Sequence, residues 1–237
     1  MCGRFALKKI DEELAELLEL DEVPDIPPRY NIAPGQLIFA IRPDRAGTGR
    51  KLVLFHWGLI PPWAKDPSIA NRLINARAET ASEKPAFRSA LKRRRCLVPA
   101  DAFYEWQKTG NKKRPFAIEM KDKRPFTFGG IHEHWIGPNG EEMESVALLT
   151  TDANDVLRPI HDRMPVIISK ADHAQWLDVS TDNAESIKGL LVPYPARGMT
   201  AYPVSTKVNN PRNDTPECAL PESVEEIREA NTPDFFA

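Results

Sequence analysis

Cys2 stands directly behind the initiator Met1, and this position gives it a chemistry that an internal cysteine lacks. Removal of Met1, which the small side chain of cysteine favours, leaves an α-amine and a thiol on one residue. Such a 1,2-aminothiol condenses with an aldehyde to an imine, and the thiol then closes a five-membered thiazolidine. Ordinary pKa values of about 7.7–8.0 for the amine and about 8.5 for the thiol make both groups nucleophilic near neutral pH. The alternative is that Cys2 is a small buried thiol of the core.

Two other residues carry side chains suited to proton transfer. Glu105 lies in the aromatic stretch 103–106 (FYEW), where loss of water would raise its pKa towards neutrality. His161 is one of five histidines and could act as a general acid or base or as an oxyanion partner. The alternatives are a surface glutamate at a strand end and a structural histidine in a turn that Pro165 ends.

Polar residues that bind sugars and phosphates accompany these groups. Asn75 could donate a hydrogen bond to a sugar oxygen, or it could cap a short helix that we predict near residues 77–82, which is the commoner role. Guanidinium groups match phosphate oxygens, but they could equally form salt bridges with the 34 acidic residues. The arginines concerned are Arg4, Arg77 and Arg163.

The elements that must position these residues are mostly short. The apolar spacing in 10–20 (IDEELAELLEL) predicts an amphipathic helix, and the prolines of 23–35 predict a rigid loop. Strands are predicted at 37–42, 51–57, 96–100, 115–120, 125–131, 146–151, 165–169 and 201–205. This pattern favours an α+β fold, a single domain built on a curved, mainly antiparallel sheet or open β-barrel with peripheral short helices.

Composition narrows the class of protein. The 237 residues are 41% hydrophobic with a net charge of −2, so a sizeable core is possible and a polybasic chain is excluded, while 32 Lys and Arg allow a local basic surface. The three cysteines (Cys2, Cys96 and Cys218) are widely spaced, which indicates a reducing compartment and argues against a disulfide framework. Their spacing does not match that of zinc ligands, and we expect neither a metal nor another cofactor. Without a signal peptide or a membrane-length apolar run, we expect a cytoplasmic protein.

Eight motifs follow one another along the chain. They are MCGRF (1–5), RYNIAPG (29–35), WGLIPPW (57–63), NARAET (75–80), RRCLVPADAFYEW (94–106), LLTTDAN (148–154), IHDRMP (160–165) and VSTKVNNPRNDTPEC (204–218). In these motifs the chain resembles the SOS-response-associated peptidase (SRAP) family, the abasic-site shielding proteins of bacteria and eukaryotes. The resemblance implies an SRAP-like domain over 2–220, followed by an acidic C-terminal tail over 221–237.

The resemblance also implies a reaction. Cys2, exposed by loss of Met1, corresponds to the nucleophile that crosslinks to the ring-opened sugar of an abasic site. Asn75 corresponds to the residue that contacts the sugar, Glu105 to the acid/base that assists imine formation, and His161 to the residue that promotes ring opening. The implied function is a thiazolidine crosslink to abasic single-stranded DNA that shields the lesion in the DNA damage response.

Further residues fall on family positions that contact DNA. The resemblance implies that the three arginines named above bind phosphates or line the pocket, and that Trp63 and Pro34 meet the flanking bases. The chain departs from the family in having Ala64 where some members carry a second Trp. A basic contact before Phe87 corresponds to Lys84.

The implied partner is single-stranded DNA with abasic sites, including single/double-strand junctions, bound by a monomer that is nucleoid-associated when on DNA. Self-processing before Cys2 is a related implied activity. Two alternatives stay open. One is a thiol peptidase that uses Cys2 with His161 as its base; the other is a single-strand binder without covalent chemistry.

Overall fold

Five strands close into a β-barrel that forms the larger part of the fold. The structure is a computed structural model that describes residues 2–44, 49–110, 112–179 and 186–222. The barrel order is β10-β4-β3-β6-β9, and β9 pairs again with β10 to close the ring. Its strands are β3 (Leu37–Pro43), β4 (Arg50–Trp57), β6 (Arg95–Ala100), β9 (Phe126–Ile136) and β10 (Glu142–Asp152).

Three short strands extend this barrel. β5 (Asn75–Arg77) runs parallel to β10, β11 (Arg163–Pro165) runs antiparallel to it, and β12 (Ile167–Ile168) pairs with β9. β10 therefore brings together β5 and β11, whose residues are remote in sequence.

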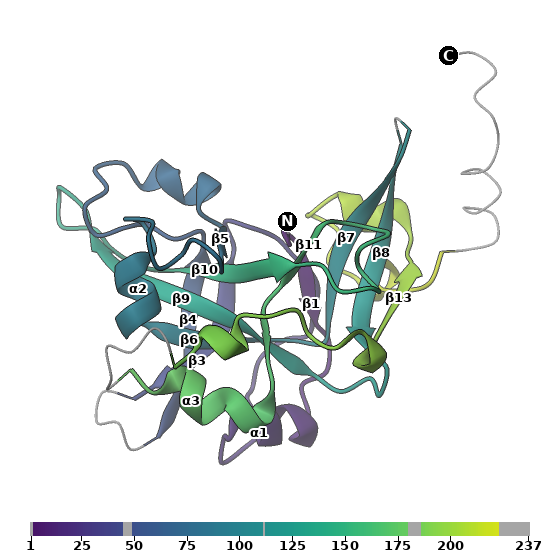
Figure 1. Cartoon of the computed structure of the whole chain (residues 1–237), viewed down its shortest axis with the longest axis horizontal. Helices are drawn as coiled ribbons and strands as arrows, with labels where there is room; N and C mark the ends of the chain where they lie inside the picture. The colour runs from purple at the N-terminus through teal and green to yellow at the C-terminus, as the bar shows by residue number, and fades with distance from the viewer. Residues whose placement is uncertain (1, 45–48, 111, 180–185, 223–237) are drawn as a thin grey trace.

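A second, antiparallel sheet lies beside the barrel, as Figure 1 shows. Its order is β13-β8-β7-β1-β2, and β1 lies between the barrel and the β7–β8 hairpin. Its strands are β1 (Phe5–Leu7), β2 (Arg29–Ile32), β7 (Ala102–Thr109), β8 (Lys112–Met120) and β13 (Met199–Pro203). This arrangement puts the start of the chain at the junction of the two sheets.

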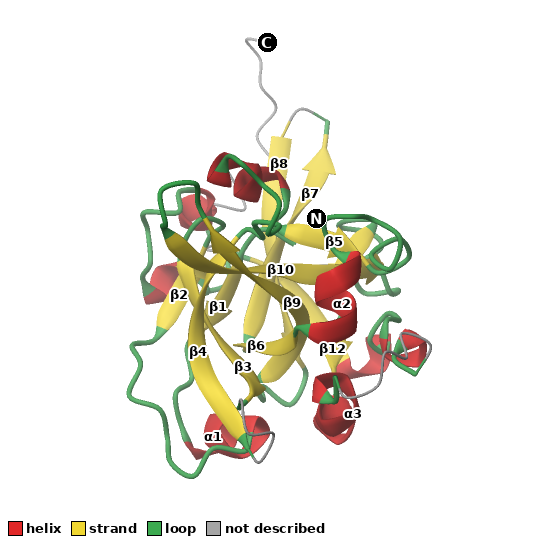
Figure 2. Ribbon diagram, turned by 90° about the vertical axis from the view of Figure 1, so that its left-hand side faces the viewer, coloured by secondary structure: helices red, strands yellow, loops and turns green. Residues whose placement is uncertain are grey.

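The helices are short and lie around the periphery of the barrel (Figure 2). The α-helices are α1 (Glu12–Leu18), α2 (Arg88–Arg93) and α3 (His173–Leu177). Short 3-10 helices lie at η1 (Pro67–Arg72), η2 (Lys170–Asp172), η3 (Lys188–Leu190), η4 (Ala196–Gly198), η5 (Thr206–Asn209) and η6 (Pro216–Cys218). Of the helices in the described ranges, none has the length and apolar character needed to cross a membrane.

Aromatic rings fix β1 against the barrel. The Phe5 ring lies 5.2 Å from Trp57 of β4 and 5.6 Å from Phe128 of β9, both in edge-to-face geometry. The Trp57 Nε1–H donates to the Ile74 carbonyl at 3.0 Å, which holds the residue before β5 against the same ring cluster. The cluster thus positions both chain segments that carry Cys2 and Asn75.

The predicted fold class is confirmed, with mainly antiparallel strands and short peripheral helices, and the barrel is closed rather than open. The helix predicted over 10–20 is confirmed in its middle: Asp11 caps α1 by accepting from the Leu14 N–H, and the chain turns left-handed at Glu19. The prediction of a rigid loop over 23–35 misses β2, which lies within it. The helix predicted near 77–82 is wrong, because consecutive turns follow β5. The predicted tail over 221–237 falls almost wholly outside the described residues.

Candidate functional site

Cys2 lies immediately before β1 with its side chain fully buried. The Asn75 Nδ2 donates a 2.7 Å hydrogen bond to the Cys2 carbonyl, and β5 holds Asn75 in place through its register with Leu148 of β10. The Asn75 Oδ1 is buried and accepts no hydrogen bond from a described residue, so it can accept one from a ligand. The capping alternative for Asn75 is wrong, since no helix follows it.

Glu105 is in the middle of β7 and 3% exposed, so the surface alternative is wrong. The β7–β1 pairing, with Phe103 opposite Phe5, brings this strand alongside the first residues of the chain. Burial raises the pKa of Glu105 to about 7, as the aromatic context predicts. Burial first, and then the nearby Glu105 charge, raise the pKa of the Cys2 thiol above its ordinary value.

His161 is half-buried, and its Nδ1 accepts a 3.0 Å hydrogen bond from the Arg163 backbone N–H. If Nδ1 accepts this bond, the neutral ring carries its proton on Nε2, whereas a hydrogen bond from Nδ1 to the Asp162 carboxylate requires the other tautomer. Burial lowers the pKa of His161 and favours this neutral form, although Asp162 Oδ1, 2.9 Å from Nδ1, acts in the opposite direction. In the tautomer that the Arg163 N–H favours, neutral His161 offers an Nε2–H donor.

Glu105 and His161 line the same open depression of about 670 Å³. Its other lining residues are Trp106, Lys108, Lys113, Ile160 and Asn209. The Gln107 Nε2 donates a 2.9 Å hydrogen bond to the Pro159 carbonyl, which ties β7 to the loop that carries His161. The depression thus combines a carboxyl group near neutrality, an imidazole donor and two lysines.

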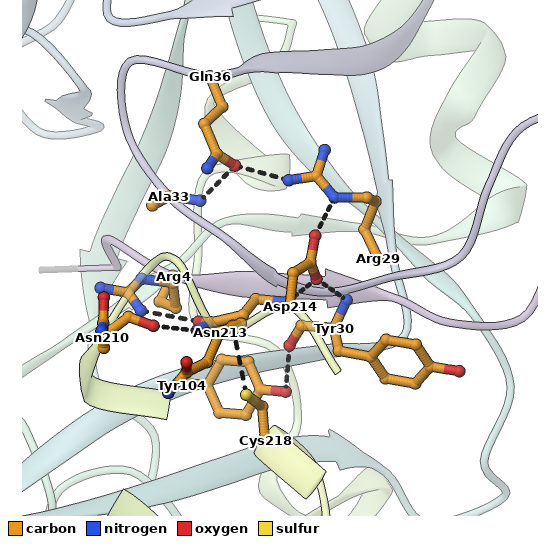
Figure 3. Close-up of polar contacts among 11 residues, drawn as sticks. Arg4, Arg29, Tyr30, Ala33, Gln36, Tyr104, Asn210, Asn213, Asp214 and Cys218 are labelled. Carbon is orange, nitrogen blue, oxygen red and sulfur yellow. Dashed lines mark hydrogen bonds and ion pairs between the residues drawn. The ribbon is translucent and has the colours of Figure 1, made fainter. Parts of the chain in front are cut away.

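A polar network holds the 204–218 segment against neighbouring strands, and Figure 3 shows its contacts around Asp214. The Asp214 carboxylate accepts from the backbone N–H of Tyr30 at 2.6 Å and of Asn31 at 2.9 Å. The Asn31 Nδ2 donates to the Asn213 carbonyl at 2.6 Å, and Trp106 Nε1 donates to Asn209 Oδ1 at 2.7 Å. The segment is thereby fixed to both β2 and β7.

Two of the three candidate arginines are engaged within the protein. The Arg4 Nη1 donates to Asn31 Oδ1 at 2.7 Å and to the Val208 carbonyl at 2.5 Å, and its guanidinium lies over the Trp106 ring. Arg163 is buried and donates through both terminal nitrogens to the Glu79 carboxylate at 2.9 and 2.8 Å. It also donates to Asp152 Oδ1 and the Thr150 carbonyl, each at 2.7 Å.

Arg163 therefore forms the salt bridges that the alternative predicts. Arg77, the third candidate arginine, is exposed at the end of β5. Phosphate binding by the three arginines stays a prediction. Trp63 is 60% exposed, in a loop that Trp135 braces by donating to the Ala64 carbonyl at 2.7 Å. Lys84 is exposed and Pro34 is half-buried.

Sequence reasoning missed four residues of the depression and its frame: Gln107, Lys108, Lys113 and Asn209. Only Asn209 falls in a family motif, and the sequence assigns it no partner. No group of three or more His, Cys, Asp or Glu side chains in the described ranges could hold a metal ion.

The fold is a closed barrel with an added sheet, in which Asn75 is hydrogen-bonded to Cys2 and Glu105 shares a depression with His161, and these features define a small β-rich protein with polar groups near the start of its chain. The family model described as SOS response associated peptidase (SRAP) matches residues 1–211. The chain belongs to this family.

Relatives and solved structures agree with this membership. "Abasic site processing protein YoqW" of Bacillus subtilis is 43% identical over 221 residues, covering 92% of this chain and 98% of the relative. "Abasic site processing protein HMCES" of Xenopus tropicalis is 33% identical, covering 81% of this chain and 65% of the relative. A crystal structure from Bacteroides thetaiotaomicron matches with a TM-score of 0.80 and 26% identity over 92% of this chain and all of that one.

Proposed function

We propose that this protein processes abasic sites in DNA by forming a covalent thiazolidine between its N-terminal Cys2 and the ring-opened sugar. The names of relatives at 43% and 33% identity support the lesion class. The observation that carries the chemistry is the convergence on Cys2: Asn75 binds its carbonyl, and the charge of Glu105 acts on its thiol. His161 shares a depression with Glu105.

The first step opens the sugar. An abasic deoxyribose is a hemiacetal in equilibrium with a small fraction of aldehyde, and only the aldehyde reacts with an amine. As the C1′–O4′ bond breaks, the proton of the C1′ hydroxyl passes to O4′ through water. The Nε2–H of neutral His161 donates a hydrogen bond to O4′ and stabilises the negative charge that develops there.

The second step forms the imine. The Cys2 α-amine, free after removal of Met1, attacks C1′, and one amine proton moves to the aldehyde oxygen. Protonated Glu105 then gives its proton to the resulting hydroxyl, which leaves as water and yields a protonated imine. A carboxyl pKa of about 7 suits this proton transfer near neutral pH.

The third step closes the ring. Glu105, now a carboxylate, takes the thiol proton of Cys2, and the thiolate attacks the imine carbon to give a neutral thiazolidine. The overall reaction releases one water, and Glu105 ends protonated as it began. Because burial raises the pKa of the thiol, the sulfur stays protonated until the imine exists, so the amine reacts first. Holding amine and aldehyde together supplies effective molarities of up to about 10⁵–10⁸ M.

We further propose single-stranded DNA, including its junctions with duplex, as the partner of a monomer formed by residues 2–220. DNA without a base is unstacked at the lesion and bends into a site at low cost. Exposed Trp63 can stack on a flanking base, and Pro34, in another loop, can contact a base as well. The exposed cations Arg77 and Lys84 can contact phosphates. Shielding of the lesion would take place in the cytoplasm, on the nucleoid.

A thiol peptidase is the weaker alternative as a main activity. A peptidase needs Cys2 as a thiolate, and both burial and the Glu105 charge raise the pKa of its thiol and disfavour that form. We retain only removal of the residue before Cys2 as a proposed self-processing activity, since the reaction above requires a free α-amine.

A denaturing gel tests the proposal. Wild-type protein incubated with an abasic single-stranded oligonucleotide should give an adduct that survives denaturant, and an oligonucleotide with all its bases should give none. Cys2→Ala and a variant with an added residue before Cys2 should both fail. An adduct with Cys2→Ala of wild-type yield would rule out the N-terminal mechanism.

A further inference from the structure

We propose that Lys108 and Lys113 form a phosphate-binding site for the DNA strand that carries the reacting sugar, an inference that rests on the proposed function. The two lysines face each other across the β7–β8 hairpin, which projects from the second sheet (Figure 1). They supply a positive charge that neither the family motifs nor the candidate DNA contacts include.

The register of the hairpin puts both lysines on the face of Trp106, and the depression reaches from them to Glu105, whose position in the strand alternates with theirs. Lys108 is directly opposite Lys113, and Trp106, two residues earlier on β7, is opposite Pro115. Since alternate residues of a strand share a face, Trp106, Lys108 and Lys113 lie on one face of the hairpin. All three line the depression that holds Glu105 and His161.

The free protein leaves this pair of charges uncompensated. Like charges directly opposite each other in an antiparallel pair destabilise the sheet. Both lysines are exposed, and neither forms an ion pair with an acidic side chain in the described ranges, whereas neighbouring Arg114 pairs with Glu222. A bound anion between Lys108 and Lys113 would offset their repulsion.

The proposed reaction identifies that anion. A deoxyribose within a strand carries a phosphodiester on each side, so a sugar placed between Glu105 and His161 brings a phosphate to the rim of the depression. The depression, at about 670 Å³, is within the roughly 300–1,000 Å³ of sites that hold molecules larger than a single sugar. A lysine ammonium binds phosphate as a point charge and tolerates a mobile backbone.

The salt dependence of binding tests the site. The probe is a single-stranded oligonucleotide with a tetrahydrofuran abasic analogue, which cannot open to an aldehyde and so reports non-covalent affinity. Each phosphate neutralised on a single strand contributes about 0.7 to the slope of log Kobs against log salt. We expect the Lys108→Ala/Lys113→Ala double variant to lose about 0.7 of slope, and Lys108→Arg/Lys113→Arg to regain it.

Lys112→Ala is the matched control. It removes one positive charge from the same hairpin, and Lys112 is also exposed but does not line the depression. Its slope should equal that of the wild type. The inference is wrong if the double alanine variant keeps the wild-type slope, or if Lys112→Ala loses as much.

Folding does not confound the result, because removing the like-charge pair should leave the melting temperature of the DNA-free double variant equal to or above that of the wild type. The same samples, given a true abasic oligonucleotide, separate the two proposals. If wild-type protein forms no denaturant-resistant adduct, the proposed function fails. If it forms the adduct and the double variant keeps the wild-type slope, only the phosphate site fails.

Discussion

Replacing Glu105 with Gln should make the protein more stable above neutral pH while slowing adduct formation. Burial raises the pKa of Glu105 from 4.5 to about 7, so its ionised form is disfavoured in the folded state. The folded protein then holds a proton that the unfolded chain loses as pH rises through 4.5, and stability falls with pH until about 7. The raised pKa of Glu105 therefore lowers the free energy of unfolding by about 3 kcal/mol at pH 8 and by under about 1 kcal/mol at pH 5.

Urea denaturation of wild type and Glu105→Gln at pH 5 and pH 8 measures this effect. The two proteins share all other titrating groups, so the change in the stability difference between the two pH values reports the titration of Glu105 together with its effect on neighbouring groups. We expect the advantage of Glu105→Gln to grow by roughly 2–3 kcal/mol from pH 5 to pH 8. The same variant should form the adduct about 10²–10⁴-fold more slowly, because it can neither give nor take a proton.

Two results would refute this reasoning. If the stability difference were the same at both pH values, Glu105 would not be a desolvated carboxyl group. If the variant were more stable at pH 8 but formed the adduct at the wild-type rate, burial of Glu105 would be real and its proton transfer would not limit the reaction.

Three further variants separate positioning, structure and DNA contact. Asn75→Ala removes the hydrogen bond to the Cys2 carbonyl, so single-turnover adduct formation should slow about tenfold while unfolding changes by about 1 kcal/mol; an unchanged rate would remove Asn75 from the site. Arg163→Ala should lower the free energy of unfolding by roughly 1–3 kcal/mol in urea, because the buried guanidinium loses its hydrogen bonds to the Thr150 carbonyl and the Glu79 carboxylate; no loss would mean that these contacts do not stabilise the fold. Trp63→Ala should change stability by less than about 0.5 kcal/mol but weaken binding of single-stranded DNA by about 1–3 kcal/mol in a fluorescence titration, and equal binding would argue against stacking.

The barrel strands were readable from sequence because their apolar residues repeat locally. The segments 37–42 and 51–57 are short runs of mostly apolar residues, and they appear as β3 and β4 with nearly the predicted bounds. The failure near 77–82 has a physical cause. The polar run after Asn75 has helix-forming composition, but β5 pairs with β10, and Ala78 N–H donates to the Thr150 carbonyl at 2.8 Å. Tertiary pairing thus overrides a local preference.

The sequence proposes candidate reactive side chains, but it does not predict the contacts that hold them. Aromatic neighbours correctly predicted that Glu105 would be desolvated. The contacts from Gln107 to Pro159 and from Arg163 to Glu79 join residues 52 and 84 positions apart, and no local pattern encodes them. The opposition of Lys108 and Lys113 depends on the register of one hairpin, which sequence alone leaves open.

The most direct test of the central proposal is the intact mass of the protein after reaction with abasic single-stranded DNA, followed by thiol alkylation in denaturant. We predict a mass equal to the protein without Met1 plus the oligonucleotide minus one water. The chain has three cysteines, and a thiazolidine consumes the thiol of Cys2, so the adduct should take up two alkyl groups, on Cys96 and Cys218. An adduct that retains Met1, or one that takes up three alkyl groups, would contradict the proposal.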